Sequence, residues 1–357
     1  MTRTDRLVYS LHRIFGLIGG LFLLMLSLTG CILLFDNVID GWLNPGMVSV
    51  SAPANTQRMP YDVAVQTLQK QFPTAQIRGL NLYPHAANRA LRADVNEGHE
   101  RLWAYVDPYT GRFLGQRNTE NVFVRQVREL HEHLLAPPVG DWILLIVGLC
   151  LVGSVLSGTW YYRKSLFSVF KIGVRWNKPK RFVYGDLHKY LGVASLLFLL
   201  VIGITGTFFH WEKTVDRLFG EGRPRGPRPE PVAIKIARSV DALLMKSATV
   251  VPGFVAEVIN FPDQPDRPFV VRGNATDANK LLGPLTAAAE FDANTGNLTK
   301  VFNANDEDAE YKLEHINEEL HYGRYGGLVS KTIYFFLSLA MTIVTATGLL
   351  IWWGKRK

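Results

Sequence analysis

The fold is decided by an apolar stretch near the N-terminus, LHRIFGLIGGLFLLMLSLTGCILLF, residues 11–35. From Ile14 onward this stretch has no charged side chain, and about 20 such residues let a helix cross roughly 30 Å of hydrocarbon. Three more stretches share its length and character: Trp142–Tyr162, Tyr190–Phe209 and Thr332–Trp353. A soluble core could bury one helix of this kind, but not four. The sequence therefore predicts an α-helical membrane protein with four transmembrane helices.

The positions of the basic residues predict how these helices are oriented. The 357 residues carry a formal net charge of +8. The clusters are Arg3, Arg6 and Arg13; Arg163, Lys164, Lys171, Arg175, Lys178, Lys180 and Arg181; and Lys355, Arg356 and Lys357. All three fall on one side of the membrane, which the positive-inside rule makes cytoplasmic. We therefore expect cytoplasmic termini and two long outside connections, in the simplest setting the periplasm of a bacterial inner membrane. This clustering explains the basic charge without nucleic acid.

The chain also repeats itself in tandem. Moved by 176 positions the first span falls on the third, and moved by 190 positions the second falls on the fourth. The matching motifs are Leu11-His12-Arg13 with Leu187-His188-Lys189, Thr29-Gly30 with Thr205-Gly206, Glu129-Leu130-His131 with Glu319-Leu320-His321, and Ser157-Gly158 with Thr347-Gly348. A unit of helix, outside domain and helix thus occurs twice in the same orientation. Such parallel repeats imply a pseudo-twofold axis along the membrane normal.

The two outside connections follow the same order of predicted elements. Each begins with a helix, Tyr61–Phe72 in the first and Val232–Met245 in the second, and continues with short alternating strands. The predicted strands are Ile77–Tyr83, Arg89–Val95, Arg101–Val106, Phe254–Asn260, Pro268–Arg272 and Ala288–Phe291. An Asp-x-x-Thr-Gly turn, Asp107–Gly111 or Asp292–Gly296, then leads into a further strand.

These elements divide the chain into consecutive parts. We expect the first transmembrane helix with a cytoplasmic N-terminus (1–40), a small outside domain (41–120), an interfacial helix with the second transmembrane helix (121–165), a basic cytoplasmic loop (166–186), the third transmembrane helix (187–215), a second small outside domain (216–305), and an interfacial helix with the fourth transmembrane helix (306–357). The stretch Glu221–Pro231, rich in Pro, Gly and Arg, is expected to be a linker.

Two helix-and-strand domains with paired Asp-x-x-Thr-Gly turns, alternating with four membrane helices, resemble the PepSY-associated transmembrane protein family. This family of iron-regulated membrane proteins includes FoxB-like ferric-siderophore reductases. The resemblance covers nearly the whole chain, and its features are more specific to the family than to one activity. It implies two small α+β, PepSY-like domains in the periplasm and an oxidoreductase with a ferric siderophore as electron acceptor.

Histidine is the main candidate for chemistry, because two cysteines are too few for a disulfide framework or a zinc cluster. Two imidazoles can hold one haem iron between two helices. His12 and His188 are equivalent in the repeat and fall at the cytoplasmic ends of the first and third spans. We expect both to be ligands of a haem iron. Gly16 and Gly192 follow one helical turn later, where a missing side chain leaves room for a flat porphyrin.

His131 and His321 form a second equivalent pair, at the outer ends of the second and fourth spans. The sequence predicts that they ligate a second haem iron. His210 competes for this site, since it lies about 33 Å beyond His188 along one predicted helix. It could replace an outer ligand or line a substrate surface, and His133 is a further candidate.

The sequence contains no nucleotide-binding fingerprint and no motif for covalent haem attachment, so we expect haem b, and expect NAD(P)H or flavin chemistry only on a partner. The best interpretation is an electron conduit. One haem near the cytoplasmic face accepts an electron, and a second passes it to a periplasmic ferric siderophore, which releases ferrous iron. The alternatives are a non-catalytic PepSY binding or regulatory membrane protein, and haem transport or sensing. The catalytic residues, the siderophore and the electron donor stay open.

Overall fold

The chain folds into two compact units in the computed structural model, which describes residues 2–52, 56–219, 238–264, 266–276 and 279–354. The first, here called the membrane unit, comprises Met1–Phe35, Gln126–Pro224 and Asn317–Lys357. The second, here called the sheet unit, comprises Asp36–Arg125 and Arg225–Ile316. Each unit therefore draws on both halves of the chain.

Four helices of the membrane unit are long and apolar enough to cross a membrane. Their spanning segments are Arg3–Leu33 (α1), Val139–Tyr162 (α6), Leu196–Val215 within α9 (Leu196–Phe219), and Gly327–Trp353 (α12). The predicted number of spans is confirmed. α1 begins early because Thr2 forms a capping box with Asp5, in which the Thr2 hydroxyl accepts from the Asp5 N–H.

The third span is not the single helix that the sequence predicts. One helix, α8, covers Lys180–Ala194, and α9 begins at Leu196. Between them Ser195 departs from helical geometry, with ψ of 8°, and its hydroxyl donates to the Leu191 carbonyl at 2.7 Å. A serine hydroxyl competes with the backbone for carbonyls in this way. His188 and His210 consequently lie on different helices, and our estimate of their separation along one helix is wrong.

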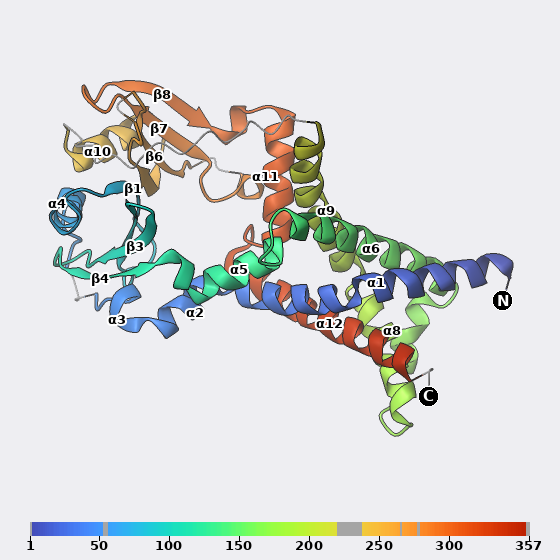
Figure 1. The fold of residues 1–357 in the computed structure, drawn as a ribbon. Helices are drawn as coiled ribbons and strands as arrows, with labels where there is room; N and C mark the ends of the chain where they lie inside the picture. Colours follow the sequence, from blue (N-terminus) through green and yellow to red (C-terminus); the bar gives the residue numbers. More distant parts are fainter. Residues whose placement is uncertain (1, 53–55, 220–237, 265, 277–278, 355–357) are drawn as a thin grey trace. The chain divides into compact units, whose positions relative to one another are not determined.

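The most extensive packing in the membrane unit joins helices that are not equivalent in the repeat. α1 packs against α6 and α12, while α9 packs against α6 and α8 packs against α12 (Figure 1). The middle of this bundle holds an apolar cluster, here called the central layer: Leu23, Val147, Leu151, Phe198, Leu199, Tyr334 and Met341.

Shorter helices adjoin the transmembrane helices along the chain. α5 (Phe123–His133) and α11 (Ala309–Tyr322) precede α6 and α12, where interfacial helices are predicted. The predicted basic loop contains η2 (Leu166–Ser168), α7 (Val169–Ile172) and the first turns of α8. The basic cluster Lys355–Lys357 lies outside the described residues.

The sheet unit contains one antiparallel sheet in the order β4-β3-β2-β1-β5-β6-β7-β8. The strands are β1 (Gln76–Asn81), β2 (Leu91–Glu97), β3 (Glu100–Val106), β4 (Phe113–Asn118), β5 (Val255–Asn260), β6 (Phe269–Asn274), β7 (Ala287–Phe291) and β8 (Leu298–Asn303). We expected two small separate domains, but β1 pairs with β5 and joins their strands. The join sets Leu80 opposite Ile259, both fully buried, and covers two strand edges that would otherwise be exposed.

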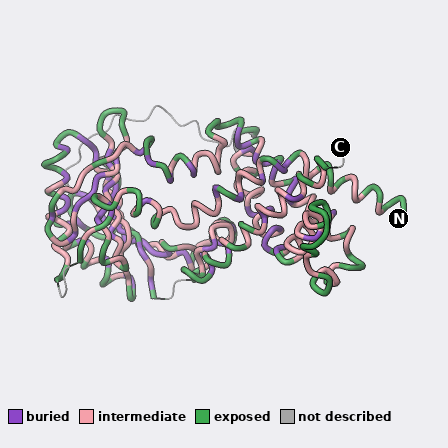
Figure 2. The backbone as a smooth tube through the Cα atoms, turned by 90° about the horizontal axis from the view of Figure 1, so that it is seen from below, coloured by how far each residue is buried: buried purple, intermediate pink, exposed green. Residues whose placement is uncertain are grey.

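Two helices cover the apolar face of this sheet, α4 (Tyr61–Gln71) and α10 (Val240–Val250). Their first turns cap each other, since Asp62 accepts from the Val240 N–H at 2.7 Å and Asp241 accepts from the Tyr61 N–H at 3.0 Å. Buried segments of the strands and helices are purple in Figure 2. Of the predicted second helix, residues 232–237 lie outside the described residues, as does the predicted linker.

Both predicted Asp-x-x-Thr-Gly turns are present. Asp107 accepts from the Tyr109 N–H at 2.8 Å, and Asp292 accepts from the Thr295 N–H at 2.7 Å. Gly111 and Gly296 end the turns at φ of 68° and 70°, a conformation that favours glycine. The remaining short helices are α2 (Asp36–Leu43), α3 (Pro45–Val48), η1 (Thr119–Asn121), η3 (Lys280–Leu282) and η4 (Ala304–Asp306).

Candidate functional site

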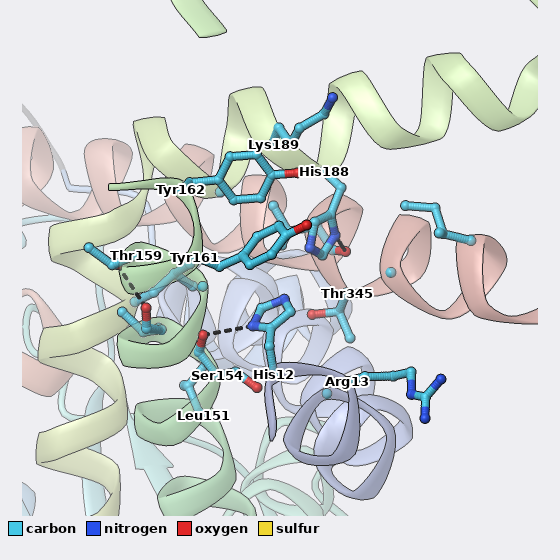
Figure 3. Close-up of a pocket in the computed structure, with 18 of the residues that line it drawn as sticks. His12, Arg13, Leu151, Ser154, Thr159, Tyr161, Tyr162, His188, Lys189 and Thr345 are labelled. Atoms are coloured by element: carbon cyan, nitrogen blue, oxygen red, sulfur yellow. Dashed lines mark hydrogen bonds between the residues drawn. The ribbon is translucent and has the colours of Figure 1, made fainter. Parts of the chain in front are cut away.

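The inner histidine pair lies in a large cavity of the membrane unit. His12 of α1 and His188 of α8 face each other with ring centroids 6.1 Å apart and ring planes at 75°. The cavity has a volume of about 960 Å³, which is in the range of cofactor sites. Tyr161 and Tyr162 of α6 lie beside the two rings (Figure 3). The structure therefore brings together the two histidines that the repeat pairs.

Backbone carbonyls fix the orientation of both inner rings. Nδ1 of His12 lies 2.9 Å from the Ser154 carbonyl oxygen, and Nδ1 of His188 lies 2.8 Å from that of Val344. A carbonyl can only accept, so Nδ1 carries the proton and Nε2 keeps its lone pair. Among the described residues, neither Nε2 makes a hydrogen bond. Both rings are thus prepared to donate to a metal through Nε2.

Glycines shape the inner site in two ways. A Cβ atom on Gly158 or Gly348 would lie 3.1 Å from Cε1 of His12 or His188, so these glycines let each ring pack closely against a neighbouring helix. Gly16 and Gly192 line the cavity, and a Cβ atom there would meet nothing within 4 Å. The space that the sequence predicts beside these two glycines is present.

The outer histidine pair has a similar arrangement with different hydrogen-bond partners. His131 of α5 and His321 of α11 lie with ring centroids 6.5 Å apart and ring planes at 64°. Their Nδ1 atoms lie 2.7 Å and 2.8 Å from the hydroxyl oxygens of Thr29 and Thr205. Each hydroxyl donates its own proton to a backbone carbonyl one turn earlier in its helix. The hydroxyl oxygen must then accept from Nδ1–H, and Nε2 again keeps its lone pair.

Burial keeps the outer imidazoles neutral. It lowers the pKa of His131 to about 4 and that of His321 to about 3, and the nearby His210 adds to both shifts. Neutral imidazole is the form that ligates metals. Cβ atoms on Gly30 and Gly206 would lie 3.5 Å and 3.2 Å from the Cε1 atoms of these rings, so glycine backs the outer pair as well.

His133 and His210 lie in a separate polar cluster around Asp141. This carboxylate is fully buried, accepts from Nδ1 of His133 at 2.6 Å and forms an ion pair with Arg217. Nδ1 of His210 lies 3.7 Å from the same carboxylate and has no hydrogen-bond partner among the described residues. The geometry therefore favours His131 and His321, rather than His133 or His210, as the facing outer pair.

The residues of both pairs fit a haem iron. A metal bound to two opposite imidazoles at about 2 Å from each nitrogen places the ring centroids roughly 6 Å apart, and the measured separations are 6.1 Å and 6.5 Å. The described residues contain no group of three or more His, Cys, Asp or Glu side chains that could hold a bare metal ion. A haem would bring its own porphyrin nitrogens, so the two histidines of a pair would be sufficient to hold it.

Several residues of the sites were not identified from the sequence. The residue types of Ser154 and Val344 do not reveal that their backbone carbonyls accept from histidines. Only the offset of 190 positions relates the two residues. Thr29 and Thr205 stand in the repeat next to glycine, but their contact with histidines more than 100 residues away was not predicted. The unmatched Asp141 gave no signal at all, because it has no acidic counterpart in the second half.

Comparison with known proteins gives one match. A sequence model of the PepSY-associated TM region matches residues 9–355. The match includes the four apolar helices, the strands between them and the histidines of both pairs. A search of curated proteins found no match.

Proposed function

The chain belongs to the PepSY-associated transmembrane family, and from that premise we propose that it is a haem b oxidoreductase of the bacterial inner membrane. It passes electrons from a cytoplasmic or membrane donor to a ferric siderophore in the periplasm. Membership of the family and four apolar helices make it an integral membrane protein. The charge clusters orient both termini toward the cytoplasm and the sheet unit toward the periplasm.

One observation carries this proposal: two histidine pairs face each other at two levels of one helix bundle. About 25 Å of helical rise on α1 separates His12 from Thr29, the partner of His131. One pair therefore belongs near each face of the membrane. A binding or regulatory protein needs neither pair, and a haem transporter needs no second site across the bilayer.

The chain's own residues have three tasks in this function. His12 and His188 hold the inner cofactor, and His131 and His321 hold the outer one. When bound, haem b supplies reversible one-electron transfer. The central layer keeps water out of the bundle between the two sites, and its residues Leu23, Leu151 and Met341 also line the inner cavity.

The acceptor step is a one-electron reduction of the siderophore iron. An electron that leaves the outer site converts Fe(III) in the chelate to Fe(II). Hard oxygen ligands hold Fe(II) less well, so the reduced iron is released. The helices and strands of the sheet unit, joined in one sheet, supply the protein surface on the periplasmic side.

The spectrum of the purified protein is the first test. We expect a reduced-minus-oxidised difference spectrum of low-spin haem b, with two haems for each chain. A colourless, folded protein contradicts the proposal and favours the binding or regulatory alternative. Haem that is stoichiometric but easily lost favours transport.

Electron delivery is tested in vesicles reduced from the cytoplasmic side, with a ferric siderophore outside. Wild-type protein should reduce the chelate, whereas His131→Ala and His321→Ala should not, although each keeps its inner haem. If both variants reduce the siderophore at the wild-type rate, the outer site is wrongly assigned and His210 is the next ligand to test. If a redox-active wild-type protein reduces no ferric chelate, the acceptor is wrong.

A further inference from the structure

The two histidine pairs differ in the atom that accepts their Nδ1–H bonds. Both inner rings donate to amide carbonyls, those of Ser154 and Val344. Both outer rings donate to hydroxyl oxygens, those of Thr29 and Thr205. The difference holds in both halves of the chain, so it distinguishes the inner level from the outer level rather than one half from the other.

Acceptor strength at Nδ1 controls how strongly Nε2 donates to a metal. A strong acceptor draws the Nδ1 proton away and makes the imidazole a more basic ligand. An amide carbonyl is a stronger acceptor than a hydroxyl oxygen. A more basic ligand stabilises ferric iron relative to ferrous iron and lowers the reduction potential, which is a recognised way in which a protein tunes haem.

The two threonine hydroxyls can only accept from Nδ1–H and cannot donate to Nδ1 instead. Each donates its single proton to a carbonyl of its own helix, Met25 at 2.9 Å for Thr29 and Val201 at 2.7 Å for Thr205. Basic side chains occur at both levels, since Arg13 and Lys189 line the inner cavity and the charge of Arg128 acts on His131.

We infer that Thr29 and Thr205 are positioning residues that set the outer haem at a higher reduction potential than the inner haem. The inference rests on the proposed function, because it concerns the cofactors that the two pairs would hold. An electron that enters at the cytoplasmic level then moves downhill to the outer level. The direction of transfer is thus set by the atoms that the histidines donate to, although the pairs themselves are nearly equivalent.

The test is a spectroelectrochemical titration of the full chain with both haems. In His12→Ala the low-spin haem that remains is the outer one, and in His131→Ala it is the inner one, which assigns each potential. In wild type the equilibrium constant for reduction should be at least tenfold larger at the outer haem, about 59 mV for a one-electron couple. The Thr29→Val, Thr205→Val double variant should raise the outer potential further, because Nδ1–H then has no acceptor, and leave the inner potential unchanged.

Two variants separate this role from a merely structural one. Thr29→Ser keeps the hydroxyl and should keep the wild-type potential. Thr207→Val removes a neighbouring hydroxyl of α9 that bonds the Gly203 carbonyl at 2.6 Å, and should move neither potential. An outer potential equal to or below the inner one, or unchanged in the double valine variant, overturns the inference while the two-haem conduit stands. A protein without haem overturns both.

Discussion

The two halves of the chain agree around their histidines and disagree in their charged networks. Each inner histidine has a carbonyl at Nδ1 and a glycine at Cε1, and each outer histidine has a threonine hydroxyl and a glycine. By contrast, Asp141 corresponds to Lys331, and Arg324 to Leu134. One outer network joins Asp141 of the first half to Arg217 of the second, and another joins Glu319 to Arg324 within the second half.

This difference indicates what the bundle has to preserve. A cofactor held between facing rings contacts both halves alike, so every atom that orients a ring is needed twice. In an ion pair beside the site, the two charges only need to balance each other, so the pair can differ between the halves. On the proposed function, the matched set therefore belongs to the cofactor sites, and the unmatched charges contribute to local stability.

The largest expected effect comes from breaking the matched inner set. His12→Ala and His188→Ala should each remove about one of two haem equivalents or leave a five-coordinate, high-spin haem, because one axial ligand is lost either way. Haem content and the visible spectrum of the purified variants measure this.

The two histidine variants should change in haem content and spectrum to the same extent, and this equality tests the pairing. His85→Ala is the control, since it removes an exposed imidazole of the sheet unit. Unchanged low-spin spectra and haem content in both histidine variants would contradict the assignment of the inner site.

The agreement between halves also explains how much of the site the sequence could predict. Four apolar stretches and the offsets of 176 and 190 positions are enough to pair His12 with His188 and His131 with His321. What the repeat cannot supply is contact between different helices, such as Thr29 with His131. Backbone acceptors are still less visible, because any residue provides a carbonyl.

The sheet unit shows a second limit of the sequence. Each outside connection reads as a complete helix-and-strand domain, and its strands were placed within a few residues. Nothing local signals that β1 pairs with β5, because Leu80 and Ile259 look like ordinary core residues of separate sheets. Likewise, no proline marks the break of the third span at Ser195, and serine is common in membrane helices.

A second prediction breaks the network around Asp141, which has no counterpart in the repeat. Asp141→Asn should lower the free energy of unfolding by about 2–3 kcal/mol, because it weakens hydrogen bonds to the partly buried His133 and Arg217. Thermal unfolding in detergent measures the change. Lys331→Gln at the equivalent position is the control and should have little effect. An unaltered unfolding temperature for Asp141→Asn would show that the network does not stabilise the bundle.

The third prediction compares one residue type at equivalent positions. Glu319 is 2% exposed and pairs with Arg324, whereas the half-buried Glu129 has no side-chain partner among the described residues. Glu319→Gln should therefore cost about 1–2 kcal/mol of stability, since Glu318 still holds Arg324. Glu129→Gln should cost less than about 0.5 kcal/mol. Chemical denaturation of both variants gives the comparison, and equal losses would refute it.

The smallest effect concerns Asp62 and Asp241, which cap each other's helices from opposite halves of the chain. Burial, together with the charge of Asp62, raises the pKa of Asp241. A carboxyl group whose pKa is higher in the folded than in the unfolded protein binds its proton more tightly when folded, so it favours folding as the pH falls through the raised value toward about 4. As the pH rises through that value, this contribution is lost.

Asp241→Asn isolates this contribution, because asparagine keeps an oxygen for the Tyr61 N–H but does not titrate. At neutral pH the variant avoids the cost of holding two nearby carboxylates ionised, and near pH 4 wild type avoids that cost by binding a proton. The unfolding temperature of wild type minus that of the variant should therefore increase steadily from pH 7 to pH 4. Groups away from this carboxylate pair titrate alike in both proteins and cancel in this difference. A difference that is constant with pH, or that decreases on acidification, would mean that the two halves cap each other without electrostatic conflict.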